Sequence, residues 1–142
     1  MKKARTLVVT PLLLLAVSIC THAQQRPLVE ANIPFAFHVR SAAFPAGTYN
    51  VTLVASFDDV IEVQSMDGRK NAIFTAPGVM EQAPAEQSRL VFRRIGDNYF
   101  LAQVWSQGSS IHRDVLKGKL EIELAKKCKK SRNAVILASN TR

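Results

Sequence analysis

The sequence is poor in the residues that cross-link small proteins: its 142 residues include two cysteines. One of them, Cys20, lies in an apolar N-terminal stretch that we expect to be removed, which leaves Cys128 as the only thiol of the mature chain. A single thiol cannot form an internal disulfide, so the fold must be held together by packing. The sequence leaves open whether Cys128 stays free or pairs between chains.

Metal-ligand spacings and catalytic motifs are missing as well. The expected mature chain has two histidines, His38 and His112, and contains neither C-x-x-C nor H-x-x-x-H, so we expect no metal and no cofactor. It also lacks G-x-S-x-G and a glycine-rich phosphate loop. Ser109, His112 and Asp114 hold the atoms of a catalytic triad, but three such residues in a polar linker are common by chance. We therefore assign no catalytic residue and predict that the protein is not an enzyme.

Only one long apolar run is present, and it lies at the start of the chain. Three basic residues precede the apolar stretch 7–19, and Thr21-His22-Ala23 places small residues at the −3 and −1 positions of a cleavage site. This order predicts a signal peptide at residues 1–23 and an exported protein, periplasmic or extracellular, that begins at Gln24. The alternatives are an uncleaved anchor and lipid attachment at Cys20, which the bulky preceding residue disfavours. No second run approaches spanning length, so we do not expect the processed chain to be a transmembrane protein.

Excess charge of one sign is missing from most of the chain. Residues 24–112 contain 7 basic and 8 acidic residues, whereas residues 113–142 contain 9 basic and 3 acidic residues. We accordingly expect a β domain at 24–112 and a basic C-terminal helix and tail at 113–142, packed on that domain or extending from it. Concentrated cations attract anionic surfaces, which outside the cytoplasm include lipid headgroups and acidic polysaccharide. The candidate contact residues are Lys126, Lys127, Lys129, Lys130 and Arg132.

Alternation of apolar and polar residues is the main structural signal. Residues 29–39 alternate strictly over six apolar positions, and residues 49–53 repeat the pattern, which predicts two half-buried strands. Pro34 places the first strand at a sheet edge or at a bulge, because proline has no N–H to donate. Phe44-Pro45-Ala46-Gly47 suits a type I turn between the two strands. We expect Tyr49 to be buried at the base of this hairpin.

Two turn signatures predict two further hairpins. The expected strands are 60–65 and 70–76 around Asp67-Gly68, and 90–95 and 99–105 around Gly96-Asp97-Asn98. The last of these strands is apolar on both faces, so we expect it at the centre of a sheet. Residues 77–88 are expected to form a polar loop, and the β region is expected to end at about residue 110.

The segment 119–130 carries conflicting signals. Leu116, Leu120 and Leu124 recur every four residues, as in a helix, whereas residues 119–124 alternate like a strand. The composition favours a helix, and a strand is the alternative. The predicted fold class is mainly β, an antiparallel sandwich or open barrel of six to seven strands with one C-terminal helix.

Two adjacent arginines, Arg93 and Arg94, lie between aromatic residues and superficially resemble a stacking platform for nucleic acid. Neighbouring residues of a strand point to opposite faces of the sheet, so the two guanidinium groups cannot form one patch. We therefore expect no nucleic-acid binding.

Four blocks of the sequence occur in a fixed order: ANIPFAFHV, FPAGTYNV, SRLVFRRIGDNYFLAQVW and RDVLKGKLEIELAKK. Together they span about residues 31–127. They resemble the ordered blocks of a family of small secreted proteins that is abundant in acidobacterial genomes. That family has no characterised function, so the resemblance implies export and architecture but no activity. This chain departs from the family pattern in Asp114, where the family has glutamate, and in its more basic C-terminus.

Two functional hypotheses follow. The leading one is an exported, non-enzymatic module that binds an unknown ligand or partner or supports the envelope. The alternative is a small secreted hydrolase or carbohydrate-active enzyme whose residues converge only in the fold. An enzyme needs a pocket in which polar or titratable groups converge, whereas a binding module needs only a surface, so the tertiary structure bears on the choice.

Overall fold

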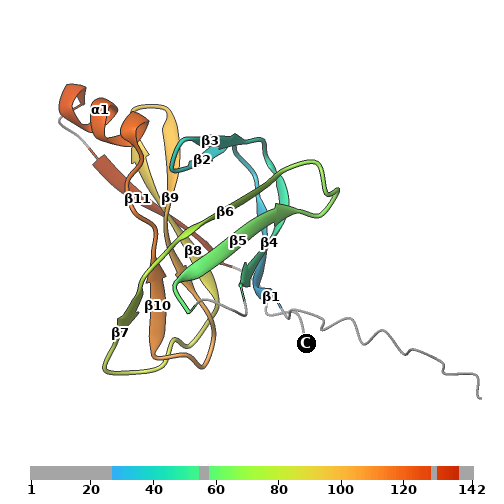
Figure 1. The fold of residues 1–142 in the computed structure, drawn as a ribbon. Helices are drawn as coiled ribbons and strands as arrows, with labels where there is room; N and C mark the ends of the chain where they lie inside the picture. Colours follow the sequence, from blue (N-terminus) through green and yellow to red (C-terminus); the bar gives the residue numbers. More distant parts are fainter. Residues whose placement is uncertain (1–26, 55–57, 129–130, 138–142) are drawn as a thin grey trace, which may run out of the picture.

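The computed structural model of the chain describes residues 27–54, 58–128 and 131–137. Two β-sheets pack face to face as a sandwich, and one helix lies at one end of it (Figure 1). The predicted fold class, a mainly β antiparallel sandwich with one C-terminal helix, is confirmed. The described residues contain eleven strands, more than the six to seven expected, because several are only three or four residues long. The predicted signal peptide, residues 1–23, lies outside the described residues.

The first sheet has four antiparallel strands in the order β1-β4-β5-β6. Their bounds are β1 Pro27–Ile33, β4 Gly47–Leu53, β5 Val60–Ser65 and β6 Asn71–Thr75. The predicted Asp67-Gly68 hairpin joins β5 and β6, and Gly68 takes a φ of 69°, which residues with a side chain rarely adopt.

The second sheet has seven strands, five of them in the order β11-β8-β9-β10-β7. Their bounds are β7 Gly78–Met80, β8 Arg89–Ile95, β9 Asn98–Trp105, β10 Ile111–Asp114 and β11 Ser131–Leu137. The other two strands, β2 (Phe37–Val39) and β3 (Ala42–Phe44), form a hairpin that joins the sheet through β9. The central position predicted for residues 99–105 is confirmed, since β9 lies between β8 and β10.

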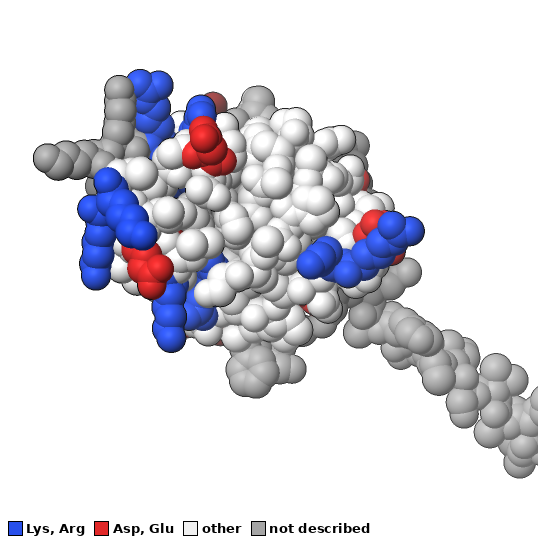
Figure 2. All heavy atoms as spheres, turned by 90° about the horizontal axis from the view of Figure 1, so that it is seen from above, with Lys and Arg blue, Asp and Glu red and all other residues white. Residues whose placement is uncertain are grey.

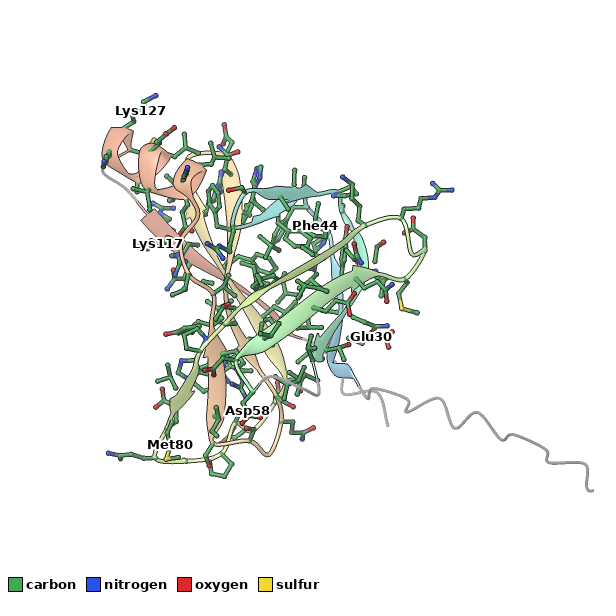
Figure 3. All side chains as sticks on the ribbon, in the orientation of Figure 1. Glu30, Phe44, Asp58, Met80, Lys117 and Lys127 are labelled. Carbon is green, nitrogen blue, oxygen red and sulfur yellow. The ribbon has the colours of Figure 1, made fainter. Side chains whose placement is uncertain are left out.

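The core lies between the two sheets and is rich in aromatic rings. Phe37 packs against Phe44, Tyr49 and Phe92, with ring centroids 5.1–5.4 Å apart, and Phe44 points between the sheets in Figure 3. Tyr49 is buried, as predicted, and its hydroxyl donates a hydrogen bond of 2.7 Å to the Pro45 carbonyl. The stretch around Pro45 is therefore a corner of the fold, tied by its own tyrosine.

The prediction of one continuous strand over residues 29–39 is wrong. Residues 29–33 belong to β1 in the first sheet, whereas residues 37–39 form β2 in the second. The break falls at Pro34, whose missing N–H ends the ladder, so the chain crosses there from one sheet to the other. The predicted alternation of buried and more exposed positions holds on both sides of the break, because both segments face the same core.

The C-terminal segment also differs from the expected basic helix and tail, packed on the β domain or extending from it. The expected boundary at residue 113 falls inside β10, and β11 pairs with β8 at seven positions. The helix α1 spans Lys119–Lys127, so it ends three residues before the predicted end at 130. Another strand, β7, lies in the expected polar loop 77–88. The part of this segment that the structure describes thus completes the second sheet.

Helix α1 is attached to the second sheet through a buried charge. Glu121 is only 2% exposed and faces Arg93 of β8, whose Nε lies 2.5 Å from a Glu121 carboxylate oxygen. Just before the helix, a Cβ on Gly118 would lie 2.5 Å from the backbone of Arg40, so a side chain there would clash with the β2–β3 turn. Within the described ranges, no helix is long and apolar enough to cross a membrane.

Candidate functional site

The outer face of the second sheet, turned away from the core, carries a cluster of polar and aromatic side chains. A β-bulge in β9 directs two of them outwards: Val91 pairs with Gln103 but Phe92 pairs with Leu101, so Ala102 is an extra residue. Gln103 and Trp105 lie two residues apart beyond the bulge, so both point to the outer face. Six residues form what we call the outer-face cluster: Glu81, Arg89, Gln103, Trp105, His112 and Asp114.

Three planar groups stack across neighbouring strands at the centre of this cluster. The imidazole of His112, on β10, lies parallel to the indole of Trp105, on β9, with ring centroids 4.2 Å apart and an interplanar angle of 12°. The guanidinium carbon of Arg89, on β8, lies 4.0 Å from the centroid of the indole. Arg89 and Trp105 are direct cross-strand partners, so the register between β8 and β9 places the two side chains next to each other.

A polar network fixes the edges of the stack. The indole N–H of Trp105 donates to Gln103 Oε1 at 3.2 Å, and Gln103 Nε2 donates to Asp114 Oδ1 at 3.0 Å. His112, only 3% exposed, has Nε2 3.3 Å from Asp114 Oδ1 and Nδ1 3.4 Å from Glu81 Oε1. The Glu81 contact has the distance of an ion pair but lacks hydrogen-bond geometry. Both nitrogens of the imidazole therefore face carboxylates.

A hollow of about 460 Å³ lies beside this cluster. Its wall is made by Arg89 and Trp105 on the sheet and by the loop 81–86. The loop is fixed by backbone hydrogen bonds from Ala85 N–H to the Ser109 carbonyl, 2.9 Å, and from Gly108 N–H to the Ala85 carbonyl, 2.8 Å. The hollow thus has a rigid wall on the sheet and an anchored loop opposite.

A second hollow, of about 410 Å³, lies at the corner around Pro45 and the β5–β6 turn. Several of its polar groups are engaged with one another. Asp67 accepts hydrogen bonds from the Ser65 hydroxyl, 2.6 Å, and from the Arg69 backbone N–H, 3.0 Å, and these lower the pKa of its carboxyl. Burial, followed by the charge of Asp67, raises the pKa of Tyr49. These groups serve the turn, so the first hollow is the better candidate site.

The atoms of a catalytic triad do not come together. The Ser109 hydroxyl bonds to the backbone of Ile111, accepting its N–H at 3.0 Å and donating to its carbonyl at 2.9 Å. Only the contact between His112 and Asp114 is present. His38 stacks on Phe100 at 5.2 Å, and Cys128 is exposed at the end of α1. Among the described residues, no group of histidine, cysteine, aspartate and glutamate side chains is placed to hold a metal ion.

The predicted basic contact residues are only partly described. Lys126 and Lys127 are exposed in the last turn of α1, and Arg132 is exposed on β11. Figure 3 shows Lys127 at the free end of the helix. Lys129 and Lys130 lie outside the described residues. Figure 2, which looks onto the end of the sandwich that carries α1, shows cationic side chains on the α1 side and on the side of the β5–β6 turn, with an uncharged area between.

The adjacent arginines of β8 behave as the sequence predicted. Arg93 points towards α1 and binds Glu121, whereas Arg94 is exposed and donates to the Gly96 carbonyl at 2.9 Å. The two guanidinium groups therefore do not form one patch.

Sequence reasoning missed four members of the outer-face cluster: Glu81, Arg89, Gln103 and Trp105. One available signal was Gln103, a polar residue within an otherwise apolar strand. The bulge that turns Gln103 and Trp105 to the outer face has no sequence signature of its own. A comparison with family models found no match, and comparisons with curated proteins and with solved structures found no significant match. The chemistry of the site therefore has to be argued from its geometry.

Proposed function

We propose that the protein is an exported, non-enzymatic binding module and that the hollow beside Trp105 is its ligand site. The observation that carries the proposal is the hollow itself, an open depression whose volume of about 460 Å³ is comparable with that of small-molecule sites, roughly 300–1,000 Å³. An aromatic ring, a guanidinium and carboxylates line it. Such a wall offers both a contact surface and charged groups that orient a ligand.

The environment of His112 supports binding rather than catalysis. A general base must present a free ring nitrogen to the proton that it removes. Here the two nitrogens face Asp114 and Glu81, and the ring is covered by Trp105. The imidazole thus serves to hold the indole in place. The hydrolase that the sequence left as an alternative gains no support from this arrangement.

Trp105 provides a direct test because it is the only tryptophan in the chain. We expect its fluorescence to change on titration with at least one member of a panel made of L-alanyl-L-alanine, glucose and glucuronate. The variant Arg94→Gln, on the neighbouring strand β8 and away from the hollow, should respond like the unmodified protein. No response to any of the three would overturn the proposal. So would turnover of an ester or glycoside substrate that is lost in a folded His112→Gln variant.

Export is part of the proposal and rests on the order of basic, apolar and small residues at the N-terminus. We expect protein recovered from outside the cytoplasm to begin at Gln24. Mass spectrometry of the intact secreted protein measures this, and a species that retains residues 1–23 would contradict it.

We further propose that the basic end of α1 contacts anionic surfaces of the envelope. Lysine acts there as a hydrated point charge, so binding should be weak and lost at 1 M salt, where screening acts over about 3 Å. We expect the double variant K126E/K127E to lose binding to phosphatidylglycerol vesicles, with phosphatidylcholine vesicles as the control. Retention of full binding by the variant, or indifference to salt, would contradict this contact.

A further inference from the structure

The cation of the hollow, Arg89, contacts Trp105 but has no carboxylate partner among the described residues. The guanidinium carbon of Arg89 lies over the Trp105 ring, 4.0 Å from its centroid. Across residues 27–54, 58–128 and 131–137, no carboxylate lies within ion-pair distance of Arg89, and no acceptor makes a hydrogen bond to its side chain. A guanidinium binds carboxylates through two parallel N–H bonds. Arg89 is therefore ready to receive a carboxylate from a ligand.

The loop that lines the hollow contributes two acidic residues. Glu81 and Glu86 both line it. Glu81 keeps one oxygen near His112 Nδ1 and is 44% exposed, and Glu86 is exposed. The two carboxylates would repel an anion bound to Arg89. Arg89 would likewise repel a cation bound to the carboxylates. A ligand that carries both a negative and a positive group can form an ion pair with Arg89 and another with the glutamates.

We propose that the hollow binds a zwitterion of the size of an amino acid or a short peptide. Its carboxylate contacts Arg89, its ammonium group contacts Glu81 and Glu86, and its carbon skeleton packs on the exposed part of Trp105. This inference rests on the proposed function and narrows it to one class of ligand.

Three forms of one dipeptide test the charges separately. The probes are L-alanyl-L-alanine, its N-acetyl derivative, which has only the negative charge, and its C-terminal amide, which has only the positive charge. We expect each blocked form to bind about tenfold more weakly than the zwitterion, as the loss of one charge-assisted hydrogen bond predicts. Fluorescence of Trp105, checked by calorimetry, measures the three affinities.

Two variants assign the charges to residues. Arg89→Gln should bring the affinity of the dipeptide down to that of its amide, because nothing remains to recognise the carboxylate. Glu86→Gln should reduce the difference in affinity between the dipeptide and its acetylated form. Arg94→Gln is the matched control, since this arginine also lies over an aromatic ring, 5.5 Å from the centroid of Tyr99, but does not line the hollow. It should leave all three affinities unchanged.

The outcomes separate this inference from the proposed function. Equal binding of the acetylated dipeptide and the zwitterion would overturn the assignment of a zwitterion. Binding of glucose or glucuronate without binding of the dipeptide would also overturn it, while the proposed function would stand. Absence of binding by every probe would overturn both.

A second inference concerns the side of the sandwich formed by β6 and β7. On one side of the molecule the edge strands β1 and β11 contact each other. On the other side β6 and β7 follow each other along the chain as the outermost strands of the two sheets. Residues 71–80 contain no charged residue, although natural edge strands commonly carry charges that prevent pairing. Ile73 is 61% exposed there, and Met80, which Figure 3 shows at the far end from α1, is 78% exposed.

The hydrogen bonds at both ends of β6 show which backbone groups are open. Ser65 N–H donates to the Lys70 carbonyl at 2.8 Å, and Ala76 N–H donates to the Asp59 carbonyl at 2.7 Å. Bonded positions alternate along an antiparallel strand. The N–H and C=O groups of Asn71, Ile73 and Thr75 therefore point away from β5, towards the open side of the sheet.

We infer that a second copy of the chain pairs with β6 in antiparallel orientation. The three open positions are symmetric about Ile73, so Ile73 lies opposite Ile73 of the second copy, and Asn71 lies opposite Thr75. No like charges meet along this register. A two-fold axis through the pair is the usual symmetry of a protein dimer, and the two four-stranded sheets become one of eight strands.

A disulfide trap tests this register. In a Cys128→Ser background, Ile73→Cys should form a dimer by oxidation, because the two Cα atoms of a hydrogen-bonded pair lie about 5.5 Å apart, within disulfide range. Thr75→Cys is the matched control, since the register keeps its two copies apart. Sedimentation of the unmodified protein should show a mass that rises with concentration, and Ile73→Lys should remove this rise. A monomer at all concentrations, or equal cross-linking at both positions, would overturn the inference.

Discussion

Among single residues, Tyr49 links the corner around Pro45 to the hydrophobic core. Its ring packs against Phe37 and Phe44, and its hydroxyl holds the Pro45 carbonyl. Tyr49→Phe should lower the free energy of unfolding by about 1 kcal/mol, the contribution of one hydrogen bond. Tyr49→Ala should lower it by about 4 kcal/mol, because it also removes a buried ring. Chemical denaturation measures both values.

Gly47→Ala is the control for this prediction. A Cβ at Gly47 would lie 3.6 Å from the Tyr49 ring, an ordinary contact, and the φ of Gly47 is not positive. We expect a change within about 0.5 kcal/mol, as for surface substitutions. An unfolding midpoint that Tyr49→Ala leaves unchanged would show that the corner does not depend on this side chain.

The same tyrosine predicts how stability depends on alkaline pH. Burial, and then the charge of Asp67, raises the pKa of Tyr49 above its ordinary value of 10.0. The stabilisation that belongs to the neutral phenol is therefore complete below pH 10.0 and is lost as the pH rises through the higher pKa of the folded state. We expect Tyr49→Phe to flatten this alkaline loss, whereas Tyr99→Phe keeps it. Denaturation series above pH 9 for the two variants compare the slopes, and equal slopes would contradict the assignment.

At the scale of the elements, helix α1 depends on one ion pair. Glu121 is buried against Arg93, which also donates a 3.3 Å hydrogen bond to the Val115 carbonyl. Glu121→Ala leaves the arginine without its carboxylate and should lower the free energy of unfolding by about 3 kcal/mol. Glu123→Ala, an exposed glutamate of the same helix, should change it by less than about 0.5 kcal/mol. Hydrogen exchange of the α1 amides should rise in the first variant alone.

Replacing both partners distinguishes the contribution of the ion pair from that of filling the buried space. Glu121→Leu with Arg93→Met should restore most of the lost stability, because apolar residues of similar size fill the space of a buried pair without an unpaired charge. A double variant as unstable as Glu121→Ala would show that the helix needs the hydrogen bonds rather than the packing.

At the scale of the whole molecule, the C-terminal strand completes the sandwich. β11 covers the outer edge of β8, and Ala134 and Ile136 pack against the core. Ile136→Ala should therefore lower the free energy of unfolding by about 2 kcal/mol, whereas Asn133→Ala, exposed on the same strand, should change it by less than about 0.5 kcal/mol. Denaturant titration of both variants tests the difference.

A chain that ends at Leu124 extends this test. The charge pattern alone suggested a β domain at residues 24–112, with a basic helix and tail at 113–142 that lie outside it. Because this truncation removes β11 and leaves the edge of β8 unpaired, we expect a loss larger than that of Ile136→Ala, with aggregation through the exposed edge. A truncated protein of unchanged stability would contradict the role given to β11.

Local sequence patterns are enough to predict most of the individual strands and turns of this protein. Strict alternation and the turns at Asp67-Gly68 and Gly96 predict strands and hairpins, because side-chain period and glycine conformation act within a few residues. Apolar residues on both faces of β9 predict its central place in the same way. The aromatic corner at Tyr49 follows from the neighbouring Pro45 and the two strands that flank it.

The distribution of these elements between the two sheets, and the position of the candidate site, depend instead on contacts between distant parts of the chain. The chain changes sheet at Pro34, and β11 returns to β8 from about forty residues away, a pairing that depends on burial across the whole fold rather than on local pattern. The outer-face cluster needs β7, β8, β9 and β10 side by side and a bulge at Ala102. Arg89, Trp105 and His112 carry no common motif, because what brings them together is the register between strands and not their spacing in the sequence.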